Sequence, residues 1–141
     1  MGVAALRLVA LAVVLVVASA SGIRAEIMVD EDIGPLSIQE TEAGIILADD
    51  SGMTVYTFDR DPPNKATCAG ACAQTWQPFL ADEKATAGYG KLDFMRREDG
   101  KRQWTYSDKP LYRYVGDQKR GEAKGAKIEG WSTVTVSYMI H

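Results

Sequence analysis

Short runs of alternating apolar and polar residues, separated by turn residues, fill most of the chain after residue 43. Such runs predict β-strands, because side chains two residues apart lie on the same face of a strand. The predicted strands are 44–49, 53–58, 91–98, 102–107, 110–115 and 131–140. The turns between them include Asp-Asp-Ser-Gly, Glu-Asp-Gly-Lys and Ser-Asp-Lys-Pro, of which Asp-Gly supplies the positive φ that a tight hairpin needs. The pattern predicts a small, mainly β domain.

Three stretches do not fit the strand pattern. Residues 68–76 are Ala-rich but short, so we expect one or two helical turns there. Residues 118–130 place charged residues around Gly and Ala without an apolar period, which predicts a long exposed loop. Residues 26–35 are acidic, and we expect them to be loosely held.

One hexapeptide pattern occurs twice, as YTFDRD at 56–61 and YRYVGD at 112–117. Both copies have a Tyr, an aromatic residue two positions later and an Asp five positions later. A turn and a strand precede each copy, and a Trp follows it, with Trp76 20 residues after Tyr56 and Trp131 19 residues after Tyr112. A single hairpin cannot bury its own apolar face, so the duplication predicts two hairpin repeats packed about a pseudo-twofold axis. Repeat one is about 44–80 and repeat two about 89–137.

Residues 1–25 have the pattern of a secretory signal peptide, with Arg7 before an apolar run from Leu8 to Val17 and small residues after it. Cleavage after Ala20 or after Ala25 fits this pattern, and the second leaves a mature domain of residues 26–141. The uncharged run is shorter than the roughly 20 residues that span a bilayer. No Cys lies at the junction to carry a lipid. We therefore expect a mature protein without a membrane span or lipid anchor.

The charge balance narrows the choice of partners. The whole chain of 141 residues has a net charge of −3, and removal of Arg7 and Arg24 with residues 1–25 makes it −5. A negative protein is a poor partner for nucleic acid or an anionic lipid surface. The remaining candidates are an envelope protein or a small ligand.

The two cysteines, Cys68 and Cys72, predict a disulfide in an oxidising compartment. Residues four apart in a helical turn have Cα atoms near the range that a disulfide permits. The bond would hold its loop against Trp76. A redox-active pair would favour the spacing C-x-x-C, which is absent.

The repeated hexapeptide permits two interpretations. Two aromatics of each copy share one face of a strand and would pack in a core with the tryptophans; these residues are Tyr56, Phe58, Tyr112, Tyr114, Trp76, Trp104 and Trp131. Asp61 and Asp117 follow the strands, where a carboxylate accepts backbone N–H bonds and fixes a turn. The alternative is that the pseudo-twofold brings Asp61 and Asp117 together in one ligand or cation site, with calcium as the hard cation that several oxygens would bind.

Catalytic groups are few. The only His is the last residue, His141, which disfavours a Ser-His or Cys-His nucleophilic site. One His and two Cys cannot complete a four-ligand Cys/His zinc site. We therefore predict no catalytic residues and no cofactor, with a metal at Asp61 and Asp117 as the alternative.

The sequence resembles the bacterial secreted-repeat proteins, often described as predicted lipoproteins with a Yx(FWY)xxD motif. The resemblance covers about residues 44–131 and includes both hexapeptides, the Cys68–Cys72 loop, Trp76 and Lys-Pro-Leu-Tyr-Arg-Tyr. It implies a periplasmic or cell-envelope location and no known activity. The chain differs in lacking a lipid-attachment Cys and in having Trp-Gln-Pro where Trp-Pro-Pro is common.

Together these features predict an exported, non-enzymatic binding or interaction module of the periplasm or cell envelope. A metal- or cofactor-binding protein that uses the Asp and Tyr residues of the repeats is the first alternative. A redox or hydrolytic enzyme is the second.

Overall fold

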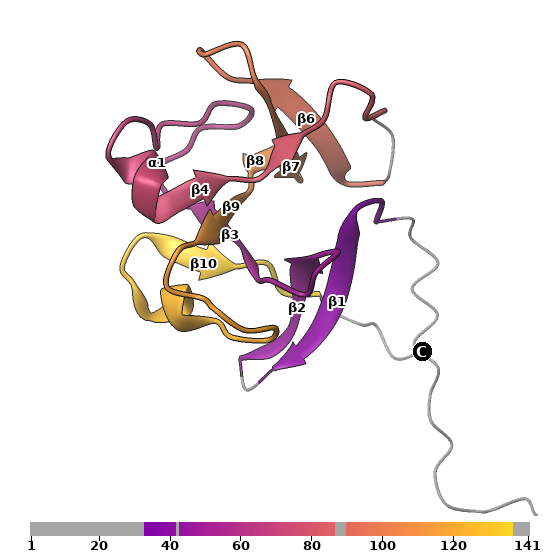
Figure 1. The fold of residues 1–141 in the computed structure, drawn as a ribbon, viewed down its shortest axis with the longest axis vertical. Coiled ribbons are helices and arrows are strands. Elements are labelled where there is room, and N and C mark those ends of the chain that lie inside the picture. The colour runs from indigo at the N-terminus through magenta and orange to yellow at the C-terminus, as the bar shows by residue number, and fades with distance from the viewer. Residues whose placement is uncertain (1–32, 42, 87–89, 137–141) are drawn as a thin grey trace, which may run out of the picture.

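The computed structural model describes residues 33–41, 43–86 and 90–136, so the predicted signal peptide lies outside the described residues. The predicted mainly β fold is confirmed (Figure 1). The strands are β1 (Leu36–Thr41), β2 (Gly44–Asp49), β3 (Val55–Phe58), β4 (Trp76–Pro78), β5 (Leu80–Ala81), β6 (Leu92–Arg96), β7 (Arg102–Tyr106), β8 (Lys109–Pro110), β9 (Tyr112–Tyr114) and β10 (Trp131–Thr133). A helical turn, α1 (Cys72–Thr75), follows the first Cys as predicted, and a short 3-10 helix, η1 (Lys124–Lys127), precedes β10.

The central sheet has the strand order β10-β3-β9-β4 and contains both hexapeptides. Its two middle strands, β3 and β9, are antiparallel, and Tyr56 lies opposite Tyr112. Trp76 on β4 lies opposite Tyr114, and Trp131 on β10 lies opposite Phe58. Each repeat therefore pairs its Trp strand with the hexapeptide strand of the other repeat. Exchanging the two repeats leaves the strand order unchanged, which is the pseudo-twofold arrangement.

The predicted hairpin between residues 44–49 and 53–58 forms only next to its turn. Ala48 pairs with Thr54, and the Asp49 N–H donates to the Met53 carbonyl at 2.8 Å. Beyond this point β3 leaves β2 and pairs with β9 and β10. An isolated hairpin is marginal in water, whereas the four-stranded sheet buries Val55 and Tyr56 completely, and this explains the long-range pairing.

Two smaller sheets flank the central one. β1 and β2 form a hairpin, while β5, β7 and β6 form a second sheet to which β8 adds along β7. The two sheets are joined to the opposite repeat in the same way. The Leu47 N–H donates to the Val134 carbonyl at 2.9 Å, and the Trp104 N–H donates to the Phe79 carbonyl at 2.8 Å. Val134 and Phe79 each lie three residues after the Trp of their own repeat.

Two sequence-based expectations need correction. β1 was not predicted, although Leu36 and Ile38 alternate with polar residues, because four of its six side chains are polar. The segment 118–130 is not a uniformly exposed loop, since it contains η1 and a buried residue, Gly125. Backbone bonds of this segment to the rest of the domain explain its order, as described below.

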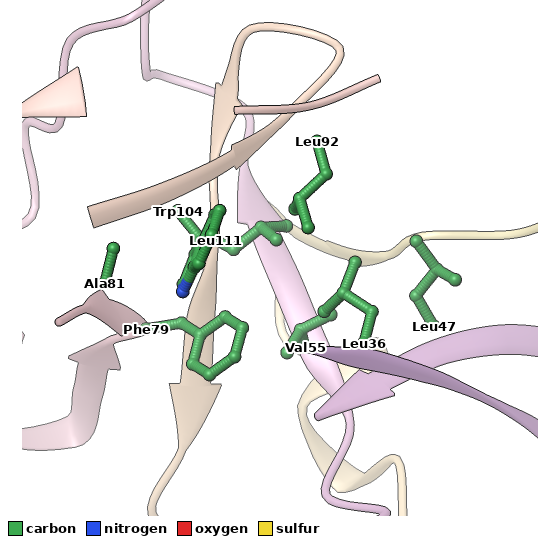
Figure 2. Close-up of a cluster of buried hydrophobic side chains, with 8 residues drawn as sticks. All are labelled: Leu36, Leu47, Val55, Phe79, Ala81, Leu92, Trp104 and Leu111. Atoms are coloured by element: carbon green, nitrogen blue, oxygen red, sulfur yellow. The ribbon is translucent and has the colours of Figure 1, made fainter. Parts of the chain in front are cut away.

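The core consists of two clusters. The first lies where the β1–β2 hairpin, β3 and the β5–β7–β6 sheet meet, and Figure 2 shows its side chains pointing toward one another: Leu36, Leu47, Val55, Phe79, Ala81, Leu92, Trp104 and Leu111. The second cluster is aromatic and contains Tyr56, Cys68, Trp76, Tyr112 and Trp131. Trp104 is buried as predicted, but it belongs to the first cluster, away from the other two tryptophans.

Two tryptophans of the second cluster and two partly buried rings packed against it form a continuous stack. The order is Tyr114, Trp76, Trp131 and Phe58, with centroid separations of 4.6, 3.7 and 4.4 Å. Tyr56 meets Trp76 edge-on at 5.2 Å, and Tyr112 meets Trp131 edge-on at 5.1 Å. The edge-on contacts have a favoured geometry of aromatic pairs, whereas the Trp76 and Trp131 rings are nearly parallel and unusually close. The stack therefore joins the two repeats at their pseudo-twofold axis.

We predict that Trp76→Ala and Trp131→Ala each lower the free energy of unfolding by about 3–5 kcal/mol, because each leaves a cavity in the aromatic core. Denaturant unfolding of the oxidised protein measures this. Val115→Ala is the control, since the Val115 side chain is 54% exposed and should cost less than about 0.5 kcal/mol. A loss for either Trp variant as small as the control loss would show that the stack does not support the core.

Candidate functional site

The Tyr and Asp side chains of the two hexapeptides form two hydrogen bonds that cross between the repeats. The Tyr56 hydroxyl donates to Asp117 Oδ2 at 2.5 Å, and the Tyr112 hydroxyl donates to Asp61 Oδ2 at 2.7 Å. The Tyr of each copy therefore binds the Asp of the other copy. We call these four residues the crossed clasp.

The remaining carboxylate oxygens bind the loops that follow each strand. Asp61 Oδ1 accepts bonds from the Thr67 N–H at 2.8 Å and the Thr67 hydroxyl at 2.6 Å. Asp117 Oδ1 accepts a bond from the Lys124 N–H at 2.9 Å. Each Asp thus ties its own loop to the Tyr strand of the opposite repeat.

These bonds bear on the two interpretations of Asp61 and Asp117. Both residues are buried, with 2% and 7% exposure, and every one of their carboxylate oxygens accepts a bond from a protein donor. In the described part of the chain, no group of three or more His, Cys, Asp or Glu side chains is arranged to hold a metal ion. The arrangement favours the structural interpretation, because a buried carboxylate without such donors would carry a large desolvation cost.

Burial raises the pKa of both phenols of the crossed clasp. For Tyr56 the loss of solvent has the largest effect, and the hydrogen bond to Asp117 raises the pKa further. For Tyr112 the order of causes is the same, with Asp61 as the partner. Both phenols therefore stay protonated and remain donors at neutral pH. This is the opposite of what a tyrosine acting as a general base needs.

The Tyr112–Asp61 pair of the clasp has additional polar neighbours from repeat two. Arg97 Nη1 donates to Gln103 Oε1 at 2.6 Å, and Gln103 Nε2 donates to the Leu111 carbonyl at 2.7 Å. The side-chain hydrogen bond of Gln103 and the charge of Arg97 lower the pKa of Tyr112, against the larger effect of burial. Sequence reasoning missed Arg97 and Gln103, which occupy ordinary positions around a predicted hairpin turn and carry no motif.

Gly125 is a second residue that sequence reasoning missed. Its N–H donates to the Tyr56 hydroxyl at 3.2 Å, which completes the contacts of that phenol. A Cβ at this position would lie 2.6 Å from the Trp76 ring and 3.0 Å from the Tyr56 ring. Only Gly allows the loop backbone to come this close to the aromatic cluster. The one sequence signal for this contact was a Gly among charged residues.

The disulfide joins Cys68 to Cys72 with a Cα separation of 5.3 Å. Cys68 is buried in the aromatic cluster, and Cys72 begins α1, which leads directly into Trp76. The bond therefore connects the end of the Asp61 loop to the start of the Trp76 strand. The corresponding loop of repeat two has no Cys.

Comparison with known families identifies the chain. Residues 37–80 and 94–135 each match the Lipoprotein_15 family, described as a secreted repeat of unknown function. The two matches together cover more than half of the chain, so the protein belongs to this secreted-repeat family. The family description supports an extracellular or envelope location. No curated protein and no solved structure matches the chain. Over the residues that the structure describes, no helix has the length and apolar character to cross a membrane.

The raised tyrosine pKa values predict a loss of stability at alkaline pH. Below the ordinary tyrosine pKa of about 10 the phenols are protonated in both the folded and unfolded states, so they add no pH dependence. Above it the unfolded state loses these protons while the folded state keeps them, and the free energy of unfolding falls.

Denaturant unfolding between pH 8 and about pH 12 measures this effect. We expect the free energy of unfolding to fall less steeply with pH in Tyr56→Phe and in Tyr112→Phe than in the parent. Tyr106→Phe is the control, because Tyr106 lies outside the clasp and is half-buried. The same slope in all three variants and the parent would contradict the account.

Proposed function

We propose that the protein is an exported, non-enzymatic binding or interaction module of the periplasm or cell envelope. The observation that carries this proposal is that the reactive groups of both hexapeptides are committed to the crossed clasp. The phenols donate to buried carboxylates, and the carboxylates hold the loops. The repeated motif is therefore a scaffold, and the two loops that it fixes are the parts that vary in chemistry.

The two loops support a binding role because they are exposed and anchored. The loop after β3 runs from Asp61 to α1 and is closed by the Asp61–Thr67 bonds and the disulfide. The loop after β9 runs from Asp117 to β10 and is closed by the Asp117–Lys124 bond. Binding residues are commonly placed on loops that a rigid scaffold holds, and a loop that is ordered before binding loses less entropy.

Site-specific photo-crosslinking in the native host tests this proposal with the full exported chain. A crosslinking amino acid at Ala69 in the first loop or at Ala126 in the second should capture a discrete partner, because both side chains are exposed. The matched control is Glu98, which is exposed in the turn between β6 and β7. Capture at the control position as strong as at the loops, or no capture at any position, would contradict the proposal.

A further inference from the structure

The end of the β1–β2 hairpin and the loop after β9 form an open groove of about 1120 Å³. In Figure 1 these are the indigo and purple hairpin and the yellow loop, which lie at the same end of the molecule. Two bonds hold the loop beside the turn that follows β2. The Gly121 N–H donates to the Gly52 carbonyl at 3.2 Å, and the Thr54 hydroxyl donates to the Glu122 carbonyl at 2.7 Å.

The groove is positive although the protein is negative. Among the described residues, its charged lining consists of four cationic and two acidic residues: Lys119, Arg120, Lys124, Lys127, Glu40 and Glu122. Among the described residues, Lys124 is the one cation of this set with an ion pair, to Glu122 at 3.1 Å. The Gln118 N–H and Lys124 lower the pKa of Glu122, so that carboxylate stays ionised and paired with Lys124. Lys119, Arg120 and Lys127 form no ion pair within the described residues, although the charge of Lys119 also lowers the pKa of Glu122.

The cationic loop is also anchored to the crossed clasp. The Lys124 N–H binds Asp117, and the Gly125 N–H binds Tyr56. The backbone that carries Lys124 and Lys127 is thus fixed before any ligand arrives, and only the ends of the side chains must be ordered on binding.

We propose that this groove binds a linear phosphate-bearing polymer, and this inference rests on the proposed binding function. The ammonium groups of Lys and the planar guanidinium of Arg both match phosphate oxygens. The groove is open and exceeds the roughly 300–1,000 Å³ of an ordinary small-molecule cleft, and its cations extend along residues 119–127. An extended ligand can contact several of them at once, whereas a single phosphate ion cannot.

Two other anionic partners fit the groove less well. Within the described part of the chain its apolar side chains are those of Ala43, Ala123 and Ala126, and none of these is long enough to enter a lipid surface. None of the described residues that line it has an aromatic side chain on which a nucleic-acid base could stack. The negative charge elsewhere on the protein is screened over about 8 Å at physiological ionic strength, so the groove can attract the polymer locally.

Binding of linear inorganic polyphosphate to the mature, oxidised protein, measured by calorimetry over a salt series, tests the inference. The double variant Lys119→Gln with Lys127→Gln removes two groove charges whose side chains make no hydrogen bond or ion pair within the described residues. We expect about tenfold weaker binding at low salt. The slope of log Kd against log salt should fall by about 1.4, because each lost phosphate contact contributes about 0.7.

The matched control is Lys84→Gln with Lys101→Gln, which makes the same change in net charge at two exposed positions away from the groove. It should bind polyphosphate like the parent. Equal losses in both double variants would overturn the inference, as would the absence of polyphosphate binding by the parent at low salt. Equal or tighter binding to anionic vesicles, to single-stranded DNA or to orthophosphate would also overturn it. If polyphosphate fails while Ala69 or Ala126 still captures a partner, the groove inference falls and the proposed function stands.

Discussion

The structure depends on two buried carboxylates, each of which receives a phenol from the opposite repeat. Asp61 and Asp117 cannot be buried without donors, and one donor to each lies on a central strand of the other copy. Neither repeat can complete its own clasp, so the duplication is a physical requirement of the fold. The same exchange occurs in the strand pairing, because each Trp strand lies beside the hexapeptide strand of the other repeat. Hydrogen bonds, strand order and ring stacking therefore all join the two halves at one axis.

The two repeats use the same clasp to support different loops. In repeat one the loop has few charged residues and is closed by the disulfide. The helical turn that begins at Cys72 then leads into Trp76. In repeat two, Gly125 follows the residue whose N–H binds Asp117, as Cys68 follows the residue whose N–H binds Asp61. Gly125 lets the backbone approach the aromatic cluster. The loop of repeat two also carries several lysines. One family pattern can therefore hold two loops of different chemistry on the same symmetric scaffold.

Much of the fold follows from local sequence patterns. Alternation predicted most strands, the Asp-Gly turn placed the β6–β7 hairpin, and the repeated hexapeptide predicted two related halves. The partners of β3 and of the two Asp residues could not be predicted, because they lie in the other repeat and no local pattern encodes pairing over more than 50 residues. β1 was missed because its polar residues hide the short alternation around Leu36 and Ile38. The positions of Gly125 and Arg97 in the site depend on tertiary contacts, and neither residue belongs to a motif with a recognisable sequence spacing.

Double-mutant cycles on the free energy of unfolding test the crossed clasp most directly. The cycles combine Tyr56→Phe with Asp117→Asn, and Tyr112→Phe with Asp61→Asn. We predict a coupling energy of about 1.5–3 kcal/mol in each, because a hydrogen bond to a buried charged group is lost only once. The same-repeat cycles, Tyr56 with Asp61 and Tyr112 with Asp117, should be additive to within about 0.5 kcal/mol. Coupling confined to the same-repeat pairs, with additivity across the repeats, would contradict the account.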